Sequence, residues 1–425
     1  MSLATLGLCP EILQALKDRG YTSATPIQKA LIPTMLQGHD IVAGAQTGTG
    51  KTAGFTLPIL QELSKEVDES RHNLKAIILV PTRELAKQLQ ESIESYGKYL
   101  SLKSVVLYGG ANISAQAKKL KSGVDIVVAT SGRLLEHIGK KNISVDSVRY
   151  LVLDEADTIL DMGFIDEVMQ IIEKLPKRRQ NVLVSATLLG SVKRLAQKIL
   201  HKPKLIEVDS MGTLAKNVEL VVHPVVKEKK IELLSYLIGF RNYQQVLVFV
   251  RKKQEADEVE KELSLSGLKT SVIHGDKSSG VRTRALEAFR DGKVRVLVAT
   301  DIVARGLDIP NLAVVINFDI PHVTGDFLHR IGRTGRAGKR GLAITLFSPK
   351  EEVALKEVER LMGKAIKREE IDGYTPKVEK AQRGARKVAT QKRKVDGAFG
   401  YKKKKSSTTT KKKRKTTKRD GWRSF

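Results

Sequence analysis

Short runs of consecutive apolar residues recur along the chain and alternate with stretches in which apolar residues have helical spacing. Between two of the runs, for example, Leu85, Leu89, Ile93, Tyr96 and Leu100 recur every three or four positions. Short apolar runs of this kind are typical of strands buried on both faces of a parallel sheet. The alternation therefore predicts an α/β fold. The predicted strands are residues 41–45, 76–80, 104–108, 125–130, 150–153 and 181–187, followed by 245–250, 270–275, 295–300, 313–318 and 342–347.

The two series of predicted strands resemble each other. "YGG" at 108–110 precedes "VVAT" at 127–130, as "HG" at 274–275 precedes "LVAT" at 297–300. A chain of 425 residues also suits two domains of roughly 150–200 residues each. We therefore predict two α/β domains of related architecture in tandem. The predicted division is a first domain at 1–207, a linker at 208–219, a second domain at 220–372 and a tail at 373–425.

Positive charge is concentrated at the C-terminal end. The whole chain carries 75 Lys and Arg against 47 Asp and Glu, a net charge of +28. Residues 374–425 alone contain 20 Lys and Arg against 3 Asp and Glu, with few aliphatic residues. This composition predicts a disordered basic tail, because it offers too little apolar surface for a core. The overall excess favours a polyanionic partner, either a nucleic acid or an anionic membrane.

Several observations favour a cytoplasmic protein. No apolar run approaches the roughly 18 residues of a membrane-spanning helix. The first residues, "MSLATLGLCPEIL", lack the basic and apolar regions of a secretory signal. Cys9 is the single cysteine, which suits a reducing compartment and leaves no internal disulfide. No membrane partner is expected.

A phosphate-binding loop follows the first predicted strand. Residues 45–52, "AQTGTGKT", match the phosphate-loop pattern with Ala45 in place of the first glycine. Backbone N–H groups in such a loop point at phosphate oxygens, and the following helix adds the positive end of its dipole. Lys51 is expected to reach the β- and γ-phosphates of ATP, and Thr52 to hold Mg²⁺. The alternative is a glycine-rich turn that happens to precede Lys-Thr. The other predicted nucleotide-binding residues are Gln46, Thr47, Gly48, Thr49 and Gly50.

Three carboxylates follow the predicted strand at 150–153. Asp154, Glu155 and Asp157 would repel one another beside a core unless a positive charge met them. Ligands of parallel sheets lie outside the carboxyl ends of the strands, so Mg²⁺ and Lys51 are the expected partners. Asp154 is predicted to bind the metal, and Glu155 to orient and deprotonate the attacking water. Taken alone, an acidic strand end is often only a helix cap or a solvated turn.

The order of the motifs resembles the DEAD-box ATP-dependent RNA helicases. The motif "DEAD" at 154–157 is the signature of that family. The others are "GYTSATPIQ" (20–28), "AQTGTGKT" (45–52), "PTREL" (81–85), "GG" (109–110), "TSGR" (130–133), "SAT" (185–187), "LVFV" (247–250), "ATDIVARGLD" (299–308) and "HRIGRTGR" (329–336). The resemblance implies two RecA-like domains. The basic tail and the stretch that begins "HGDKSSGVR" look most like the bacterial RhlE-type subgroup.

The resemblance also implies roles at the nucleotide. Gln28 would recognise the adenine through its amide, and Tyr21 would flank the base. Asp308 would help to place the ribose and the catalytic water, and Arg333 and Arg336 would act as arginine fingers on the γ-phosphate. The residues that would couple the nucleotide site to the RNA site are Ser185, Thr187, Asp157 and His329.

Contacts with the RNA backbone are implied for a further set of residues. They are Thr82, Arg83, Gly110, Thr130, Gly132, Arg133, Gly275, Thr300 and Arg305. Ser131 replaces the proline usual in this family, which we expect to loosen a turn. Ser279 stands where a glutamine is common, so one polar contact on the RNA side differs from the family pattern.

The chemistry of the two arginines agrees with the implied role. A phosphoryl-transfer transition state spreads charge over its equatorial oxygens, and a guanidinium fork matches that geometry. If the forks lie on a different domain from Lys51, ATP holds the two domains together and hydrolysis releases them. The alternative for residues 329–336 is a basic surface loop.

We therefore predict an ATP-dependent RNA helicase with ATP and Mg²⁺ as cofactors. A grip on the RNA backbone implies little sequence preference. The alternative is a nucleotide-gated RNA-binding clamp or RNA chaperone whose unwinding is incidental. A DNA translocase is disfavoured by the resemblance. Ribosomal or RNA-decay assemblies are candidate partners besides RNA itself.

Overall fold

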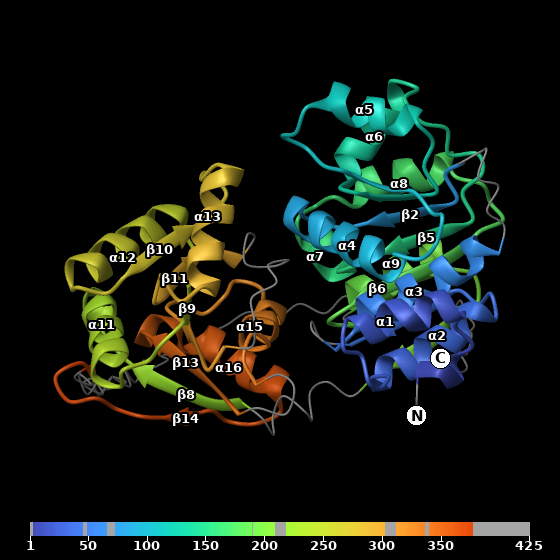
Figure 1. Ribbon diagram of the computed structural model, residues 1–425. Coiled ribbons are helices and arrows are strands. Elements are labelled where there is room, and N and C mark those ends of the chain that lie inside the picture. The colour runs from blue at the N-terminus through green and yellow to red at the C-terminus, as the bar shows by residue number, and fades with distance from the viewer. Residues whose placement is uncertain are drawn as a thin grey trace, which may run out of the picture. The chain divides into compact units, whose positions relative to one another are not determined.

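A computed structural model describes residues 3–45, 49–65, 73–188, 190–208, 218–301, 312–335 and 340–376. In this part of the chain, the residues form two sheets, each with helices on both faces (Figure 1). None of the helices here has the length and apolarity needed to cross a lipid bilayer. The strand–helix alternation predicted from the apolar runs is confirmed.

The first sheet lies between residues 41 and 207, and its described strand pairs are all parallel. The strand order is β3-β4-β2-β5-β6-β1-β7. The bounds are β1 Ile41–Gly44, β2 Ala76–Leu79, β3 Ser104–Leu107, β4 Ile126–Ala129, β5 Tyr150–Leu153, β6 Gln180–Ser185 and β7 Lys204–Glu207. All the predicted strands are present. Edge strand β7 was not predicted, because it is mostly exposed and has no apolar run.

Two apolar clusters sandwich the first sheet, because successive strand residues point to opposite faces. One cluster joins the sheet to α1 Pro10–Asp18, α2 Pro26–Leu36, α3 Lys51–Ser64 and α4 Arg83–Tyr96. The other joins it to α5 Ile113–Lys121, α6 Ser131–Gly139, α7 Ala156–Asp161, α8 Ile165–Lys174 and α9 Gly190–Ile199. Helix α4 ends at Tyr96, with Gly97 as its C-cap, so Leu100 packs on the core from beyond the helix and not as part of it.

The second sheet repeats the topology of the first. Its order is β10-β11-β9-β12-β13-β8-β14, which becomes the order of the first sheet when seven is subtracted from each number. The bounds are β8 Val218–Pro224, β9 Val246–Phe249, β10 Thr270–Ile273, β11 Val296–Ala299, β12 Val314–Asn317, β13 Gly341–Phe347 and β14 Lys367–Arg368. The predicted relation between the two domains is thereby confirmed.

Helices cover both faces of the second sheet as well. α11 Lys230–Phe240 and α12 Lys253–Leu265 pack on one face. α13 Ser279–Arg290, α15 Thr324–Ile331 and α16 Glu352–Met362 pack on the other. β8 begins at Val218, two residues before the predicted start of the second domain, and Tyr374 packs on α11. Residues 377–425, and with them most of the predicted tail, lie outside the described residues.

Candidate nucleotide and RNA sites

Three neighbouring strands deliver the candidate ATP-binding residues to one edge of the first sheet. In the order β5-β6-β1, the carboxyl ends of the strands lead to Asp154, Ser185 and the loop that ends at Lys51. Lys51 is the first residue of α3, is buried, and donates a hydrogen bond from Nζ to the carbonyl of Ala45. The N-terminus of α3 therefore combines a buried ammonium group with the positive end of a helix dipole, which is the arrangement that binds anionic phosphates.

Gly50 and Gln28 connect the phosphate loop to α2. Gly50 caps α3 in the left-handed conformation, with φ of 93°. Gln28 is buried, and its Nε2 donates to the carbonyl of Gly50 at 3.2 Å while its Oε1 accepts from the N–H of Thr25 at 3.0 Å. A Cβ at Gly50 would lie 2.4 Å from Nε2 of Gln28. Glycine is therefore required here both by conformation and by the close approach of α2.

The signature carboxylates are buried at the end of β5. Asp154 is 4% exposed, and its Oδ1 accepts a hydrogen bond from the N–H of Glu155 at 2.9 Å. Burial raises the pKa of Asp154 to about 7, against the opposing charge of Lys51. Glu155 adopts φ 50° and ψ 52°, a left-handed conformation that is rare outside glycine. Strained residues of this kind gather at functional sites.

The side chains at this edge fit a magnesium ion. Mg²⁺ prefers oxygen ligands and is held through one or two carboxylates together with substrate phosphates. Asp154 supplies a desolvated carboxylate, and Thr52 supplies a hydroxyl one residue after Lys51. Oε2 of Glu155 is buried and accepts no hydrogen bond among the described residues. A cation and its water would meet these buried oxygens.

Asp157 organises the predicted coupling residues. Its Oδ2 accepts from the N–H of Ala186 at 3.1 Å and from the N–H and Oγ1 of Thr187, both at 3.0 Å. Ser185 Oγ donates to the carbonyl of Thr187 at 2.7 Å. His329 Nε2, from α15, lies 3.3 Å from the same Oδ2 of Asp157. Burial opposes ionisation of Asp157, but His329 and the hydrogen bonds outweigh it and hold the pKa of Asp157 well below its usual range. The structure thus brings all four predicted coupling residues together.

The segment that contains Arg333 is buried and is not a basic surface loop. Arg333 is 2% exposed and follows α15. Arg330, which was not among the predicted site residues, is 1% exposed and donates from Nε and Nη2 to the two carboxylate oxygens of Asp301, at 2.5 and 2.7 Å. This bidentate pair ties α15 to the loop after β11.

A groove of about 460 Å³ collects most of the predicted RNA-binding residues. Its lining includes Thr82, Arg83, Thr130, Gly132, Arg133 and Gly275. Thr82 caps α4 by accepting from the N–H of Leu85 at 3.2 Å, and Thr130 is the N-cap residue of α6. The groove therefore combines helix N-termini with three arginines, which suits a phosphate backbone, and it is also lined by three glutamates. Glu84 and Arg282, an ion pair at 2.9 Å that was not predicted from the sequence, also line it.

The side chains behind the groove hold Arg133 in place. Arg133 Nη1 donates to the carbonyl of Ala111 and to Oε1 of Gln116, both at 3.0 Å. His137 is fully buried, with Nε2 3.1 Å from the same Gln116 oxygen and Nδ1 3.1 Å from Nδ2 of Asn142. Burial, and then the charge of Arg133, lower the pKa of His137.

Two further predicted RNA-binding positions and one departure are also described. Gly110 has φ of 79°, and a Cβ there would lie 2.9 Å from Nη1 of Arg83. Thr300 is buried after β11. The turn at Ser131 is not loosened as expected, because Ser131 is the buried first residue of α6 and its Oγ donates to Glu167. The hydroxyl thus replaces the rigidity that a proline would give.

Tyr21 and Thr49 lie within the described part of the chain, and six other predicted site residues lie outside it. Tyr21 is described, and its hydroxyl lies 2.9 Å from that of Tyr96, with the two rings edge to face. Thr49 is described as well. The predicted site residues outside the described part are Gln46, Thr47, Gly48, Arg305, Asp308 and Arg336.

The second domain has a lysine and an aspartate at related positions, but its lysine is already bound by oxygens of its own domain. Lys230 begins α11 after β8, as Lys51 begins α3 after β1, and Asp319 follows β12, as Asp154 follows β5. Lys230 Nζ lies 3.4 Å from Asp319 and 2.9 Å from Glu351, and it donates to the carbonyl of Phe318 at 2.8 Å. The ammonium group is thus enclosed by oxygens of its own domain, and the segment before it lacks the glycines of a phosphate loop. The phosphate-binding features therefore belong to the first domain.

The fold and these sites define a nucleotide-binding α/β protein with two RecA-like domains. Residues 25–195 match the model of the DEAD/DEAH box helicase family, and residues 229–338 match that of the helicase conserved C-terminal domain. The "DEAD-box ATP-dependent RNA helicase CshA" of Bacillus cereus is 38% identical over 387 residues, which cover 91% of this chain and 72% of the relative. The "ATP-dependent RNA helicase CshA" of Listeria monocytogenes is 40% identical over 388 residues, with coverage of 91% and 73%.

A solved structure shows the same fold. "S. cerevisiae Dbp5 bound to RNA and ADP BeF3" superposes with a TM-score of 0.78 at 30% identity, covering 87% of this chain and 96% of that one. The chain belongs to the DEAD-box family of ATP-dependent RNA helicases. Both relatives named above are CshA proteins, so the similarity supports the family and not specifically the RhlE-type subgroup.

Proposed function

We propose that the protein hydrolyses Mg²⁺-ATP at the edge formed by β1, β6 and β5, and that it uses the hydrolysis to open and release short RNA duplexes. The observation that supports this proposal most directly is the buried cluster of Lys51, Asp154 and Glu155 at the carboxyl ends of neighbouring strands. Mg²⁺, when bound, neutralises charge on the phosphate oxygens. Lys51 and the N-terminus of α3 bind the phosphates, and Asp154 and Thr52 hold the metal. Glu155 accepts the proton of the attacking water at its buried carboxylate.

The second domain completes the site in this proposal. Arg333 and Arg336 stabilise the transferring phosphoryl group, Asp308 helps to place the ribose and the catalytic water, and Gln28 and Tyr21 select the adenine. The bidentate pair of Arg330 with Asp301 supports this assignment, because it anchors α15, the helix that Arg333 directly follows.

RNA binds along the groove lined by Thr82, Arg83, Thr130 and Arg133 in this proposal. The lining includes hydroxyls and guanidinium groups, which suit phosphates and sugars, together with three glutamates, of which Glu84 and Glu136 are paired with Arg282 and Arg133. Little sequence preference is expected, because phosphate contacts carry no sequence information. Gly110, Gly132, Gly275, Thr300 and Arg305 are proposed to contribute to the same path. The network around Asp157 carries the state of the nucleotide site to this groove, since it joins β6, α7 and α15.

The finer identity of the protein is proposed on the sequence alone. Membership of the RhlE-type subgroup rests on the basic tail, and a cytoplasmic location rests on the single cysteine. Ribosomal and RNA-decay assemblies are proposed as partners, because a helicase without sequence preference needs another component to choose its RNA. The division into 1–207, 208–219, 220–372 and 373–425 is kept as the proposed domain plan.

Strand displacement tests the proposal. A short RNA duplex is offered to the full-length protein with Mg²⁺-ATP, with a non-hydrolysable analogue, or with no nucleotide. Rapid displacement and repeated turnover with ATP alone is the expected result. Tight binding with either nucleotide but no displacement would support the clamp, the second candidate function. A comparison of RNA and DNA as stimulators of ATP hydrolysis tests the choice of nucleic acid, and equal stimulation by both would contradict it.

A further inference from the structure

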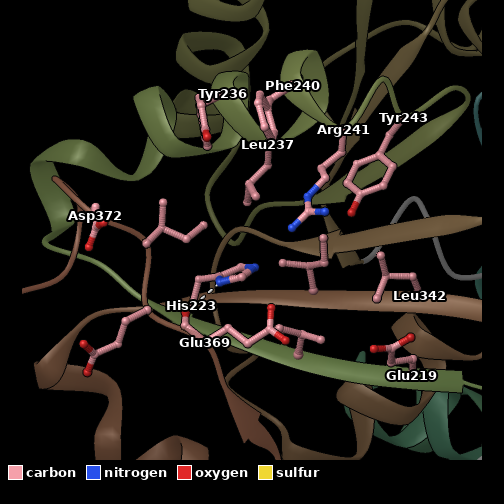
Figure 2. Close-up of a pocket in the computed structure, with 14 residues that line it drawn as sticks. Glu219, His223, Tyr236, Leu237, Phe240, Arg241, Tyr243, Leu342, Glu369 and Asp372 are labelled. Atoms are coloured by element: carbon pink, nitrogen blue, oxygen red, sulfur yellow. Dashed lines mark hydrogen bonds between the residues drawn. The ribbon is translucent and has the colours of Figure 1, made fainter.

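A second groove, of about 590 Å³, lies on the second domain and takes no part in the proposed ATP or RNA sites. Its floor is formed by β8 and β13, and one wall by the C-terminal end of α11. The segment after β14 forms the other wall (Figure 2). His223 lies on the floor, with Nδ1 2.8 Å from the carbonyl of Glu369. Because burial lowers the pKa of His223, this side chain adds no charge at neutral pH.

The groove is acidic. Four carboxylates line it, against a single guanidinium, that of Arg241. Glu369 is paired with Lys367 at 2.5 Å. Among the described residues, no cation pairs with Glu219, Glu370 or Asp372, and all three are exposed. A phosphate backbone would be repelled from this surface, whereas a lysine-rich peptide would be attracted to it.

The groove is also rimmed by exposed aromatic rings. Tyr236 and Phe240 of α11 are 40% and 69% exposed, and their rings stack at 5.1 Å. The ring of Tyr374 also stacks on that of Tyr236, with 5.8 Å between the ring centroids. Cations already lie over the two outer rings of this aromatic stack, with Lys229 over Tyr374 and Arg241 over Phe240. Exposed rings of this kind bind both cationic and aromatic side chains.

One segment of the same chain has the complementary chemistry. Residues 399–425 contain 12 Lys and Arg against one Asp, with Phe399, Tyr401, Trp422 and Phe425 among them. Twenty-seven positions separate Phe399 from Asp372 on the groove wall. At about 3.3 Å per residue, that length lets the segment reach either end of the groove. The entropic cost of closing such a loop rises only slowly with its length.

We propose that the acidic aromatic groove docks residues 399–425 of its own chain, and that RNA displaces them. The docking stands on the groove and the sequence alone, whereas the displacement also requires this basic segment to bind the phosphates of RNA, which its charge favours. Because the two segments share one chain, their effective concentration is in the millimolar range, so individually weak contacts suffice. Free protein would then keep its basic segment occupied, and RNA would compete for it through its phosphates.

The test uses the full-length protein without RNA and two readouts. Trp422 is the only tryptophan, so quenching of its fluorescence by acrylamide reports on this segment. A carbodiimide then links carboxylates to lysines in contact, and mass spectrometry identifies the pairs. We expect Trp422 to be shielded relative to an isolated 399–425 peptide at low salt and not at high salt, because the contacts are largely ionic. We also expect links from Glu370 and Asp372 to lysines beyond residue 401.

Matched variants decide the outcome. Glu370→Gln/Asp372→Asn and Phe240→Ala change exposed side chains, so the fold is expected to survive. Each should raise quenching of Trp422 toward the peptide value, whereas Glu258→Gln/Glu262→Gln on exposed positions of α12 should not. Quenching equal to the peptide value in the unaltered protein would overturn the docking. Shielding that grows with protein concentration would overturn it too, since it would assign the groove to a second copy.

Single-stranded polyuridine separates the docking from the displacement. It should abolish the carbodiimide links if RNA and the groove compete for the segment. Links that persist at saturating RNA would overturn the claim that RNA displaces the segment from the groove. The proposed function would not be affected, because ATP hydrolysis and separation of RNA strands test it independently. The groove variants should also bind RNA more tightly than the unaltered protein at low salt. An unchanged affinity would count against competition.

Discussion

Glu155 is held at a cost in the free protein. Its backbone is in the left-handed region, which costs a non-glycine residue about 1–2 kcal/mol. Its side chain is 5% exposed, and Oε2 has no hydrogen-bond partner among the described residues. An unsatisfied buried polar atom costs about 1–3 kcal/mol, and more when charged. The carboxylate of Asp154 is on the preceding residue, so like charges add to that cost.

Glu155→Gln should therefore separate stability from activity. The amide keeps the shape of the side chain but removes the charge and its repulsion of Asp154. We expect the free energy of unfolding of the first domain to rise by about 1 kcal/mol, because a neutral unpaired group is cheaper to bury than a charged one. In a domain of this size that raises Tm by about 2–4 °C. Turnover of ATP should fall by about 10²–10⁴-fold, the usual contribution of a general base.

Scanning calorimetry without nucleotide and a steady-state, RNA-stimulated ATPase assay measure the two effects. Glu173→Gln makes the same charge change at an exposed position of α8, and it should alter neither Tm nor turnover. ATP binding should persist in Glu155→Gln, because Lys51 and Asp154 remain. Near-normal turnover would remove Glu155 from the role of base. A lowered Tm would refute the argument that its charge is uncompensated in the free protein.

Four other predictions follow from the same geometry. Arg333→Ala should lower RNA-stimulated ATPase by about 10³-fold or more, and Arg333→Lys should not restore it, because a lysine lacks the guanidinium fork; full activity of the lysine variant would show that charge alone matters. Gly50→Ala should weaken ATP binding about tenfold or more in a titration with a fluorescent nucleotide, since φ is 93° and the new Cβ would lie 2.4 Å from Gln28; unchanged affinity would contradict this. The pKa of His137 is lower in the folded state than its ordinary 6.5, so the unfolded chain takes up the proton at a higher pH. The contribution of neutral His137 to the free energy of unfolding is therefore complete above about pH 6.5 and is lost as the pH falls below it. Denaturant unfolding of His137→Gln should show a smaller loss of stability over this pH range. Deleting residues 377–425 should reduce the slope of log RNA affinity against log salt concentration by about 0.7 for each phosphate that the tail neutralises in the full-length protein. The maximal ATPase rate should stay nearly unchanged. Equal slopes for the two proteins would show that the tail does not contact RNA.

The strands and the chemical motifs could be read from local sequence. Runs such as residues 76–80 and 245–250 are short, apolar and bounded by polar residues, and each became a strand buried on both faces. The loop at 45–52 and the carboxylates at 154–157 depend on residue types at fixed spacing, so they too were visible. Edge strands β7 and β14 escaped because an edge position needs no continuous apolar run. Strand β8 was not predicted either, although it lies inside its sheet between β13 and β14.

The tertiary structure decided which side chains meet. The order β5-β6-β1 brings Asp154 and Lys51, more than a hundred residues apart, to one edge, and no local pattern contains that order. Whether Arg330 or Arg333 anchors its helix also depended on Asp301, 29 residues away. The acidic groove beside Phe240 joins α11, β8 and the segment after β14, whose carboxylates lie far apart in the sequence. Local spacing determines backbone conformation and residue chemistry, whereas a site depends on contacts that only the packing of distant elements creates.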